Sequence, residues 1–346
     1  MLLAKGWSLH LIYTKGKRKR RTPAKKPAEL ILNFLVDVAG AVVVVSITFF
    51  CFSKLHYLMT IIFISVMTTI CICGAGTMGS GIAQVSATAG FKTILFDVND
   101  AVVETAKTKI ENGLQTLVSK QKITAEKKEN ILQQFVFTSN INDCIADVII
   151  EAVVEKLEIK ISLFNQLAAL NSDKTIFATN TSSLSISEIA IKISKPGNFA
   201  GLHFFNPAPI MKLVEVVKGE QTSDETISQL IELTRKFGKT PVVCKDSPGF
   251  IVNRVARPYY IESLRLAEEG FADFETIDRL LESKGFKMGP FKLMDLIGND
   301  INYAVSCSVY DQLNQPERLK PSSIQKEKVE KGELGKKTGK GYYNYK

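Results

Sequence analysis

Residues 69–79 read TICICGAGTMG, and this stretch decides the fold. The apolar run 69–73 predicts a short buried strand, and the residues after Gly79 have the apolar spacing of an amphipathic helix. The glycines between them form a GxGxxG motif, which allows a tight turn, a close approach of pyrophosphate to the backbone, and close packing of helix on strand. The helix N-terminus offers N–H groups and a partial positive charge to phosphates. The sequence therefore predicts a dinucleotide-binding turn at Gly74, Gly76, Thr77, Met78 and Gly79.

A second predicted strand, 92–97, ends in an acid where such folds bind the adenosine ribose. Asp97 lies 18 residues after Gly79. Its carboxylate is expected to accept hydrogen bonds from both ribose hydroxyls and to repel a 2′-phosphate. No Arg follows directly to pair with such a phosphate, so NAD is favoured over NADP.

Further strand patterns alternate with amphipathic stretches along the first half of the chain. They lie at 146–154, 175–179, 199–205 and 212–217. This alternation predicts an α/β protein with a Rossmann-type, doubly wound and mostly parallel sheet.

The turn Asp246-Ser-Pro-Gly249 ends this pattern, and residues 250–269 then read as one long helix. The remaining sequence is helical in its apolar spacing, and its tail, 332–346, carries an aromatic run expected to pack back on the body. We therefore expect an NAD-binding domain at 67–246 and an all-helical C-terminal domain at 247–346.

Residues 1–66 form a basic and apolar leader. They hold ten Lys or Arg against two acids, whereas the remaining 280 residues hold 34 basic and 33 acidic side chains. A nearly neutral body argues against binding of nucleic acid, which requires clustered cations.

Two interpretations of the leader stay open. The basic run 15–26 precedes the apolar residues 30–52, an arrangement that resembles the positive-inside flank of a membrane anchor. Alternatively, Met67 is the true start, because it stands two residues ahead of the first strand and the preceding residues are then upstream sequence read in frame. The first interpretation predicts a membrane-anchored protein and the second a cytoplasmic one.

The six cysteines show neither CxxC pairs nor dense spacing, which favours a reducing compartment. Cys71 and Cys73 alternate inside an apolar run, so we expect them to act as small core side chains. No metal site is predicted.

His203 is the one histidine outside the leader, and it stands at the end of a predicted strand, the edge where α/β sheets place their ligands. Oxidation of an alcohol requires a base that accepts a proton as hydride leaves, and histidine suits that task at neutral pH. Glu215, in the neighbouring strand-like run, is a carboxylate that could orient the imidazole. Taken by themselves, the residues favour structural roles instead: His203 as a histidine whose hydrogen bonds are satisfied, and Glu215 as an edge-strand side chain in contact with solvent.

Seven segments spread over residues 67–346 carry recognisable motifs; they are 74–97, 180–184 (NTSSL), 203–207 (HFFNP), 211–215 (MKLVE), 246–254 (DSPGFIVNR), 288–290 (MGP) and 335–342 (GKKTGKGY). In these motifs and in their order the chain resembles the 3-hydroxyacyl-CoA dehydrogenase family, and its compact size is similar to that of the short-chain 3-hydroxybutyryl-CoA dehydrogenases.

The resemblance implies a hydride transfer between NAD and C3 of a (3S)-3-hydroxyacyl-CoA, in fatty acid or butanoate metabolism. It assigns His203 and Glu215 to a catalytic dyad, and Ser182 and Asn253 to holding the substrate oxygen. It also implies cofactor contacts at Glu155, Lys160, Asn206 and Lys337, and a contact of Lys120 with the CoA moiety.

Where a serine of the family can touch CoA, this chain has Gly113, so that contact is lost or moved. Lys120 could also be a solvated charge on its helix. The family further implies a homodimer formed through the C-terminal domain.

Two other functions fit these residues less well. A non-catalytic NAD-binding protein of the same fold would not need Ser182, His203, Glu215 and Asn253 together. A β-hydroxyacid or sugar-nucleotide dehydrogenase would place a lysine or cysteine at its centre instead of a histidine and a glutamate. The sequence does not report the preferred acyl chain length.

Overall fold

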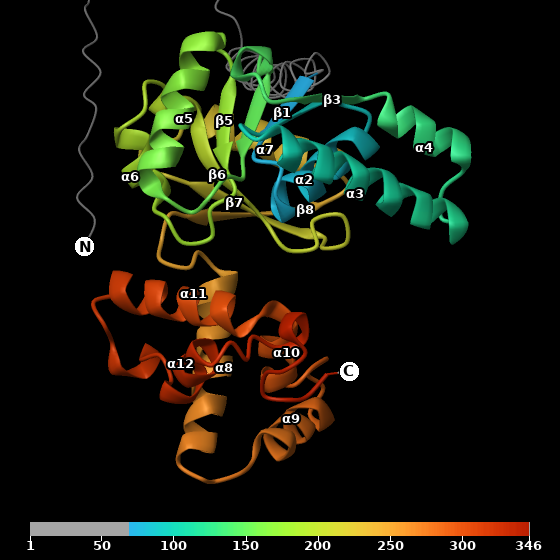
Figure 1. Cartoon of the computed structure of the whole chain (residues 1–346). Helices are drawn as coiled ribbons and strands as arrows, with labels where there is room; N and C mark the ends of the chain where they lie inside the picture. Colours follow the sequence, from blue (N-terminus) through green and yellow to red (C-terminus); the bar gives the residue numbers. More distant parts are fainter. Residues whose placement is uncertain (1–68, 346) are drawn as a thin grey trace, which may run out of the picture. The chain divides into compact units, whose positions relative to one another are not determined.

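The computed structural model describes residues 69–345, which form one sheet with helices on both faces and a group of helices after it (Figure 1). The strands are β1 (Thr69–Cys73), β2 (Lys92–Phe96), β3 (Phe135–Thr138), β4 (Val148–Glu151), β5 (Ile176–Thr179), β6 (Phe199–Phe204), β7 (Leu213–Lys218) and β8 (Thr240–Lys245). The helices of the sheet domain are α2 (Thr77–Thr88), α3 (Asp100–Ser119), α4 (Ala125–Leu132), α5 (Leu157–Leu170), α6 (Ile186–Ile191) and α7 (Asp224–Lys236). Those that follow are α8 (Val252–Glu268), α9 (Phe274–Ser283), α10 (Pro290–Ile297), α11 (Asn299–Gln312) and α12 (Ser323–Glu330).

The sheet has the order β3-β2-β1-β4-β5-β6-β7-β8, which confirms the predicted Rossmann-type architecture. Every neighbouring pair is parallel except β6 and β7, which run antiparallel. The order reverses direction between β1 and β4, and ligands of such sheets bind at the carboxyl ends of the strands beside that switch point.

The strand predictions need correction in three places. The predicted strand 146–154 is shorter in the structure, where only β4 (Val148–Glu151) is a strand. The N–H of Val153 donates to the carboxylate of Glu151 at 2.7 Å and not to a neighbouring strand. β2 ends at Phe96 and leaves Asp97 outside it. β3 and β8 were not predicted; both lie at edges of the sheet and are only partly buried, so they lack the apolar run of a central strand.

The alternating side chains of β1 serve two cores, one on each face of the sheet. Ile70 and Ile72 pack in the core that α2, α3 and α7 cover. Cys71 and Cys73 pack in the core that α5 and α6 cover, and both are fully buried as expected. Cys144 joins them there, so that three thiol sulfurs lie within 4.8 Å of one another. Hydrogen bonding to Cys144, followed by burial, raises the pKa of the Cys71 and Cys73 thiols.

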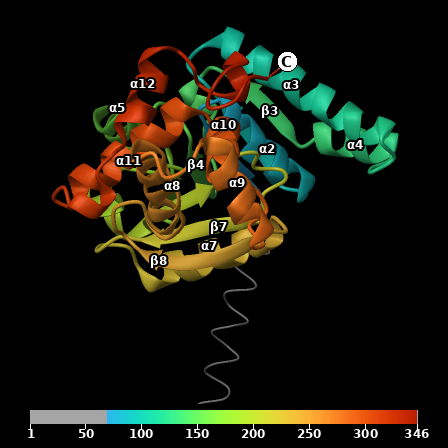
Figure 2. The ribbon, with the colours of Figure 1, turned by 90° about the horizontal axis from the view of Figure 1, so that it is seen from below.

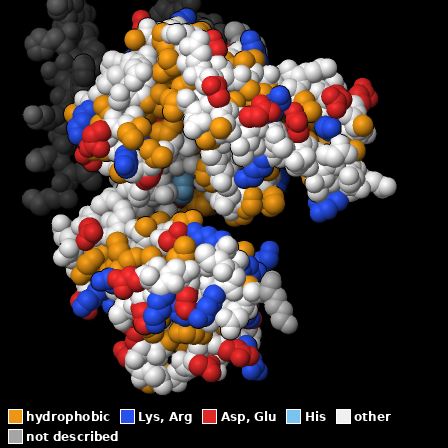
Figure 3. Space-filling model, viewed as in Figure 1, with side chains coloured by type: hydrophobic (Ala, Val, Ile, Leu, Met, Phe, Trp, Pro, Cys, Tyr) orange, Lys and Arg blue, Asp and Glu red, His pale blue; other side chains and the backbone are white. Residues whose placement is uncertain are grey.

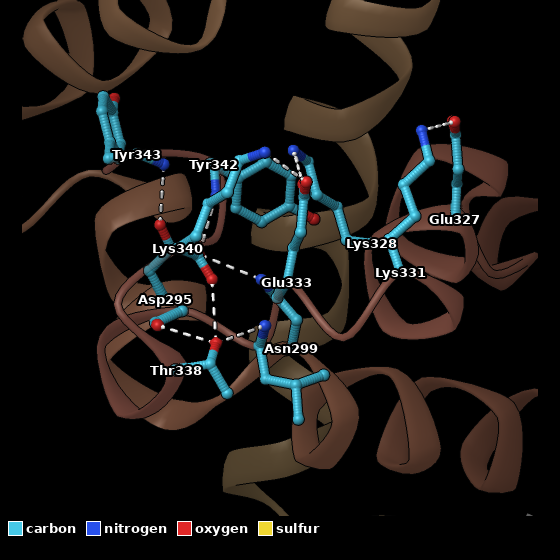
Figure 4. A network of polar contacts seen from close by, with 12 residues as sticks. Asp295, Asn299, Glu327, Lys328, Lys331, Glu333, Thr338, Lys340, Tyr342 and Tyr343 are labelled. Atoms are coloured by element: carbon cyan, nitrogen blue, oxygen red, sulfur yellow. Dashed lines mark hydrogen bonds and ion pairs between the residues drawn. The ribbon is translucent and has the colours of Figure 1, made fainter. Parts of the chain in front are cut away.

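After the sheet, the chain is helical as predicted, and α8 extends within one residue or two of the predicted bounds (Figure 2). The aromatic tail packs back on these helices through Asp295, which is almost fully buried. The Asp295 carboxylate accepts hydrogen bonds from the N–H groups of Tyr342 and Tyr343, both at 3.0 Å (Figure 4). It also accepts a hydrogen bond from the hydroxyl of Tyr345 at 2.9 Å. The predicted docking of the tail is therefore confirmed.

The predictions for the leader fall outside residues 69–345. Among the helices of residues 69–345, none combines the length and the apolarity that a bilayer span requires. Acidic and basic side chains are interspersed over the face of the described part seen in Figure 3, in agreement with its nearly equal numbers of the two charges.

Candidate active site

The glycine turn has the geometry that a bound dinucleotide needs. A Cβ at Gly79 would lie 1.7 Å from the carbonyl oxygen of Gly74, so only glycine allows the first turn of α2 to pack so closely on the loop. Gly74 itself has φ +102°, a conformation that favours glycine. At Gly76 a Cβ would meet nothing within 4 Å, which leaves open space beside the N-terminus of α2. These residues fit a pyrophosphate held by backbone N–H groups.

Asp97 stands directly after β2, at the same edge of the sheet as this turn. Its Oδ2 accepts the N–H of Ala75 at 2.9 Å, and its Oδ1 accepts the N–H of Asn99 at 3.1 Å. The carboxylate therefore braces the glycine turn as well as standing where the ribose is expected. This second role was not apparent from the sequence.

His203 and Glu215 form a direct cross-strand pair of the antiparallel β6 and β7. Nδ1 of His203 lies 2.7 Å from Oε2 of Glu215, and both side chains are almost fully buried. A carboxylate can only accept, so the proton of the neutral imidazole sits on Nδ1 and Nε2 is left to accept a proton. The pair has the arrangement of a base and its orienting group.

The other oxygen of Glu215 is also fixed, because Oε1 accepts the N–H groups of Ile251 and Val252 at 3.0 and 2.9 Å. Burial acts to raise the pKa of Glu215, but the hydrogen bonds from His203 and Val252 outweigh it, and the net effect lowers the pKa. The carboxylate is thus held in its charged form. The aromatic rings of Phe205 and Phe250 flank the imidazole, with centroids 4.5 and 5.8 Å away.

Ser182 lies in the loop that follows β5, the strand paired with β6. Its N–H donates to Oε1 of Glu155 at 3.2 Å, and the hydroxyl of Ser183 donates to the same oxygen at 2.9 Å. Lys160, only 1% exposed at the first turn of α5, places its Nζ 3.1 Å from Oε2 of Glu155. Glu155, Lys160 and Ser182 are therefore brought together at the carboxyl edge of the sheet.

The remaining predicted residues are more scattered. Asn206 is exposed two residues after β6, and Asn253 is partly buried in the first turn of α8. Lys120 is exposed at the C-terminal end of α3. Lys337 pairs with Asp300, with Nζ 2.6 Å from Oδ1, and none of the contacts found within residues 69–345 joins it to the glycine turn.

Three side chains at this edge were not singled out from the sequence. Oδ1 of Asn180 accepts the N–H of Phe204 at 2.8 Å and so ties the end of β5 to β6. Lys239 is buried and donates to the carbonyl oxygens of Ala208 and Met211 in the loop after Asn206. Glu151 is a fully buried acid at the end of β4. An acid inside an apolar strand pattern was the one available signal for Glu151.

The chain matches two family models: "3-hydroxyacyl-CoA dehydrogenase, NAD binding domain" over residues 69–247, and "3-hydroxyacyl-CoA dehydrogenase, C-terminal domain" over residues 249–345. Together these matches cover nearly all of the described residues.

Individual relatives agree with the family models. A 3-hydroxyadipyl-CoA dehydrogenase of Escherichia coli is 48% identical over 279 residues, which are 80% of this chain and 59% of the relative. A probable 3-hydroxyacyl-CoA dehydrogenase of Caenorhabditis elegans is 38% identical over 86% of this chain and 98% of its own length. The solved structure of (S)-3-hydroxybutyryl-CoA dehydrogenase from Ralstonia eutropha is 36% identical with a TM-score of 0.78, over 81% of this chain and 99% of that one. This chain thus spans about three fifths of the first relative and almost all of the other two.

Proposed function

Because this chain belongs to the 3-hydroxyacyl-CoA dehydrogenase family, we propose that it interconverts (3S)-3-hydroxyacyl-CoA and 3-ketoacyl-CoA thioesters with NAD. The observation that carries the proposal is the buried pair of His203 and Glu215 at 2.7 Å, on neighbouring strands of a sheet that also bears the NAD-binding turn. The dyad supplies a base with a fixed tautomer beside a dinucleotide site, which is what oxidation of a secondary alcohol requires.

Each proposed residue has one task. When bound, NAD supplies the acceptor for the hydride that leaves C3. Nε2 of His203 accepts the proton of the 3-hydroxyl, and Glu215 stabilises the imidazolium that results. The hydroxyl of Ser182 and the amide of Asn253 can each hydrogen-bond the substrate oxygen, whether alcohol or ketone.

The residues assigned to NAD each hold a different part of the cofactor. The turn at Gly74, Gly76 and Gly79 holds the pyrophosphate, and Asp97 holds the adenosine ribose. Glu155 and Lys160 lie next to the Ser182 loop, so we assign them to the nicotinamide end of the cofactor. Asn206, Lys337 and Lys120 remain proposals that rest on the family resemblance alone.

A rate comparison tests the function and narrows its substrate. We expect NADH-dependent reduction of acetoacetyl-CoA, and the E. coli relative makes 3-oxoadipyl-CoA the most informative second substrate. Longer 3-ketoacyl-CoA thioesters complete the series, each with NADH and with NADPH. If none of these thioesters is reduced although NADH binds, the proposal of a non-catalytic NAD-binding protein takes its place.

We also propose a homodimer formed through the C-terminal domain. Several large apolar side chains of this domain are exposed, among them Val255 (70%), Leu296 (51%) and Ile301 (51%). A protein contact would bury such side chains, so these residues are the candidate contact surface. Sedimentation analysis of the wild type and of Val255→Asp distinguishes a dimer from a monomer.

A further inference from the structure

We propose that Glu151 is a positioning residue, which holds Lys160 and thereby aligns the nicotinamide-binding residues with the loop of Ser182. The proposal rests on the function proposed above, because that function assigns tasks to Glu155, Lys160 and Ser182. Glu151 itself faces the interior of the protein, so it acts through Lys160 and not on substrate.

The carboxylate of Glu151 is held in place by its position in the sheet. Glu151 is the last residue of β4, paired with Cys73 of β1 on one side and with Thr179 of β5 on the other. Its side chain is fully buried. Oε2 accepts the hydroxyl of Thr179 at 2.6 Å, and Oε1 accepts the N–H of Val153 at 2.7 Å. Two strands and the following turn therefore hold the carboxylate in one place.

Lys160 depends on this carboxylate. Its Nζ lies 2.6 Å from Oε1 of Glu151, and the two side chains are 1% and 0% exposed. A buried ammonium without a partner is strongly unfavourable, so Glu151 decides where Lys160 lies. The same Nζ reaches Oε2 of Glu155, which is 38% exposed and stands at the surface. Lys160 thus bridges a buried carboxylate and an accessible one.

Glu155 connects Lys160 to the loop of Ser182. Its Oε1 accepts a hydrogen bond from the hydroxyl of Thr181, the N–H of Ser182 and the hydroxyl of Ser183. Loss of Glu151 would leave Glu155 as the remaining partner of Lys160. The lysine would then move toward the surface and compete for the oxygen that orders the loop.

The same end of β4 also touches the glycine turn. The N–H of Ala152 donates to the carbonyl oxygen of Cys73 at 2.7 Å, and a Cβ at Gly74 would lie 2.6 Å from the oxygen of Ala152. Glu151 therefore stands between the turn that receives NAD and the loop that holds the substrate oxygen. A displacement of about 1 Å between reacting groups is enough to cost roughly 10²-fold in rate.

The test is Glu151→Gln, which keeps the shape and removes the charge. We expect the dissociation constant of NADH, measured by fluorescence titration, to rise about tenfold, and kcat with acetoacetyl-CoA to fall roughly 10–100-fold. Thr179→Val removes one hydrogen bond to Glu151 and keeps the strand, so it should change both quantities in the same direction by less. That second variant keeps the proposal testable if Glu151→Gln does not fold.

The matched control is Asp278→Asn, which also removes the charge of a fully buried acid held by N–H groups, here those of Phe291 and Lys292. It should lower the melting temperature without changing NADH affinity or kcat. If Glu151 acts through Lys160, then removing Glu151 should have no further effect once Lys160 is gone. The double variant Glu151→Gln with Lys160→Met should therefore bind NADH no more weakly than Lys160→Met alone.

Two results would overturn the proposal. One is a Glu151→Gln protein that is destabilised like the control but keeps wild-type NADH affinity and kcat. The other is a double variant in which the two effects multiply, because the residues would then act independently. If wild-type protein reduced no 3-ketoacyl-CoA, the proposed function would fail, whereas the NADH titrations would still decide the role of Glu151 in cofactor binding.

Discussion

Replacement of Glu215 by Gln should abolish most of the activity while the fold persists. The carboxylate has two fixed sets of partners: Oε2 faces Nδ1 of His203 at 2.7 Å, and Oε1 accepts two backbone N–H groups near 3 Å. A glutamine has only one oxygen to serve both. If that oxygen stays on Ile251 and Val252, the amide NH₂ faces His203 and forces the proton onto Nε2, the atom that must accept the substrate proton.

The magnitude follows from the charge that is lost. An imidazolium and a carboxylate about 4 Å apart attract each other by about 4 kcal/mol at an effective dielectric constant of about 20. That energy corresponds to a rate factor of about 10³, inside the range of roughly 10²–10⁴ expected for loss of a general base or its orienting group. We predict a fall in kcat in that range for Glu215→Gln and for His203→Asn.

The assay is the steady-state oxidation of NADH by acetoacetyl-CoA, accompanied by fluorescence titration of NADH binding and by thermal melting. NADH affinity should barely change, because neither residue is assigned to the cofactor. The double variant should be little worse than the worse single variant, because the two residues act as a unit. A His203→Asn protein that kept more than about a tenth of wild-type turnover would refute the reasoning, since the general base would then have to be sought elsewhere.

Three further predictions test other parts of the account. Gly76→Ala should keep the stability of the wild type but bind NADH more weakly, because its Cβ enters open space needed by the pyrophosphate. Gly79→Ala should lose both stability and NADH affinity, because its Cβ would contact Gly74. Thermal melting and NADH titration distinguish these two outcomes. Asp97→Asn should narrow the preference for NADH over NADPH in kcat/KM, and equal use of both cofactors by the wild type would contradict the assignment. Burial raises the pKa of Tyr342, so above pH ~10 only the unfolded chain loses the phenol proton, and the free energy of unfolding falls as the pH rises. Tyr342→Phe should therefore reduce the slope of the free energy of unfolding against pH in this range by up to ~1.4 kcal/mol per pH unit. An unchanged slope would contradict this role of Tyr342.

The parts of the site that could be predicted are those fixed by local sequence. The glycine turn and Asp97 belong to one βαβ unit, in which spacing along the chain determines position in space. His203 was placed at a sheet edge by its strand pattern, and Glu215 was a candidate partner in the neighbouring run, but only the family resemblance decided that the two form a pair. The antiparallel register that brings the two together depends on which strand follows which in the sheet.

The parts of the fold and of the site that could not be predicted depend on contacts between segments that are distant in the sequence. Cys144 meets Cys71 and Cys73 only because the loop before β4 packs on the face of β1. Glu151 was hidden in a run read as an apolar strand, and its partners Thr179 and Lys160 come from β5 and α5. Spacing along one sequence does not report such pairs.

The most direct test of the account is the acetoacetyl-CoA-dependent oxidation of NADH by the wild-type protein, measured beside His203→Asn, with the configuration of the product determined. We expect (3S)-3-hydroxybutyryl-CoA from the wild type, and turnover at least about 10²-fold lower from a variant that still binds NADH. A wild type that binds NADH and oxidises none of it with this or any other 3-ketoacyl-CoA, or a variant as fast as the wild type, would contradict it.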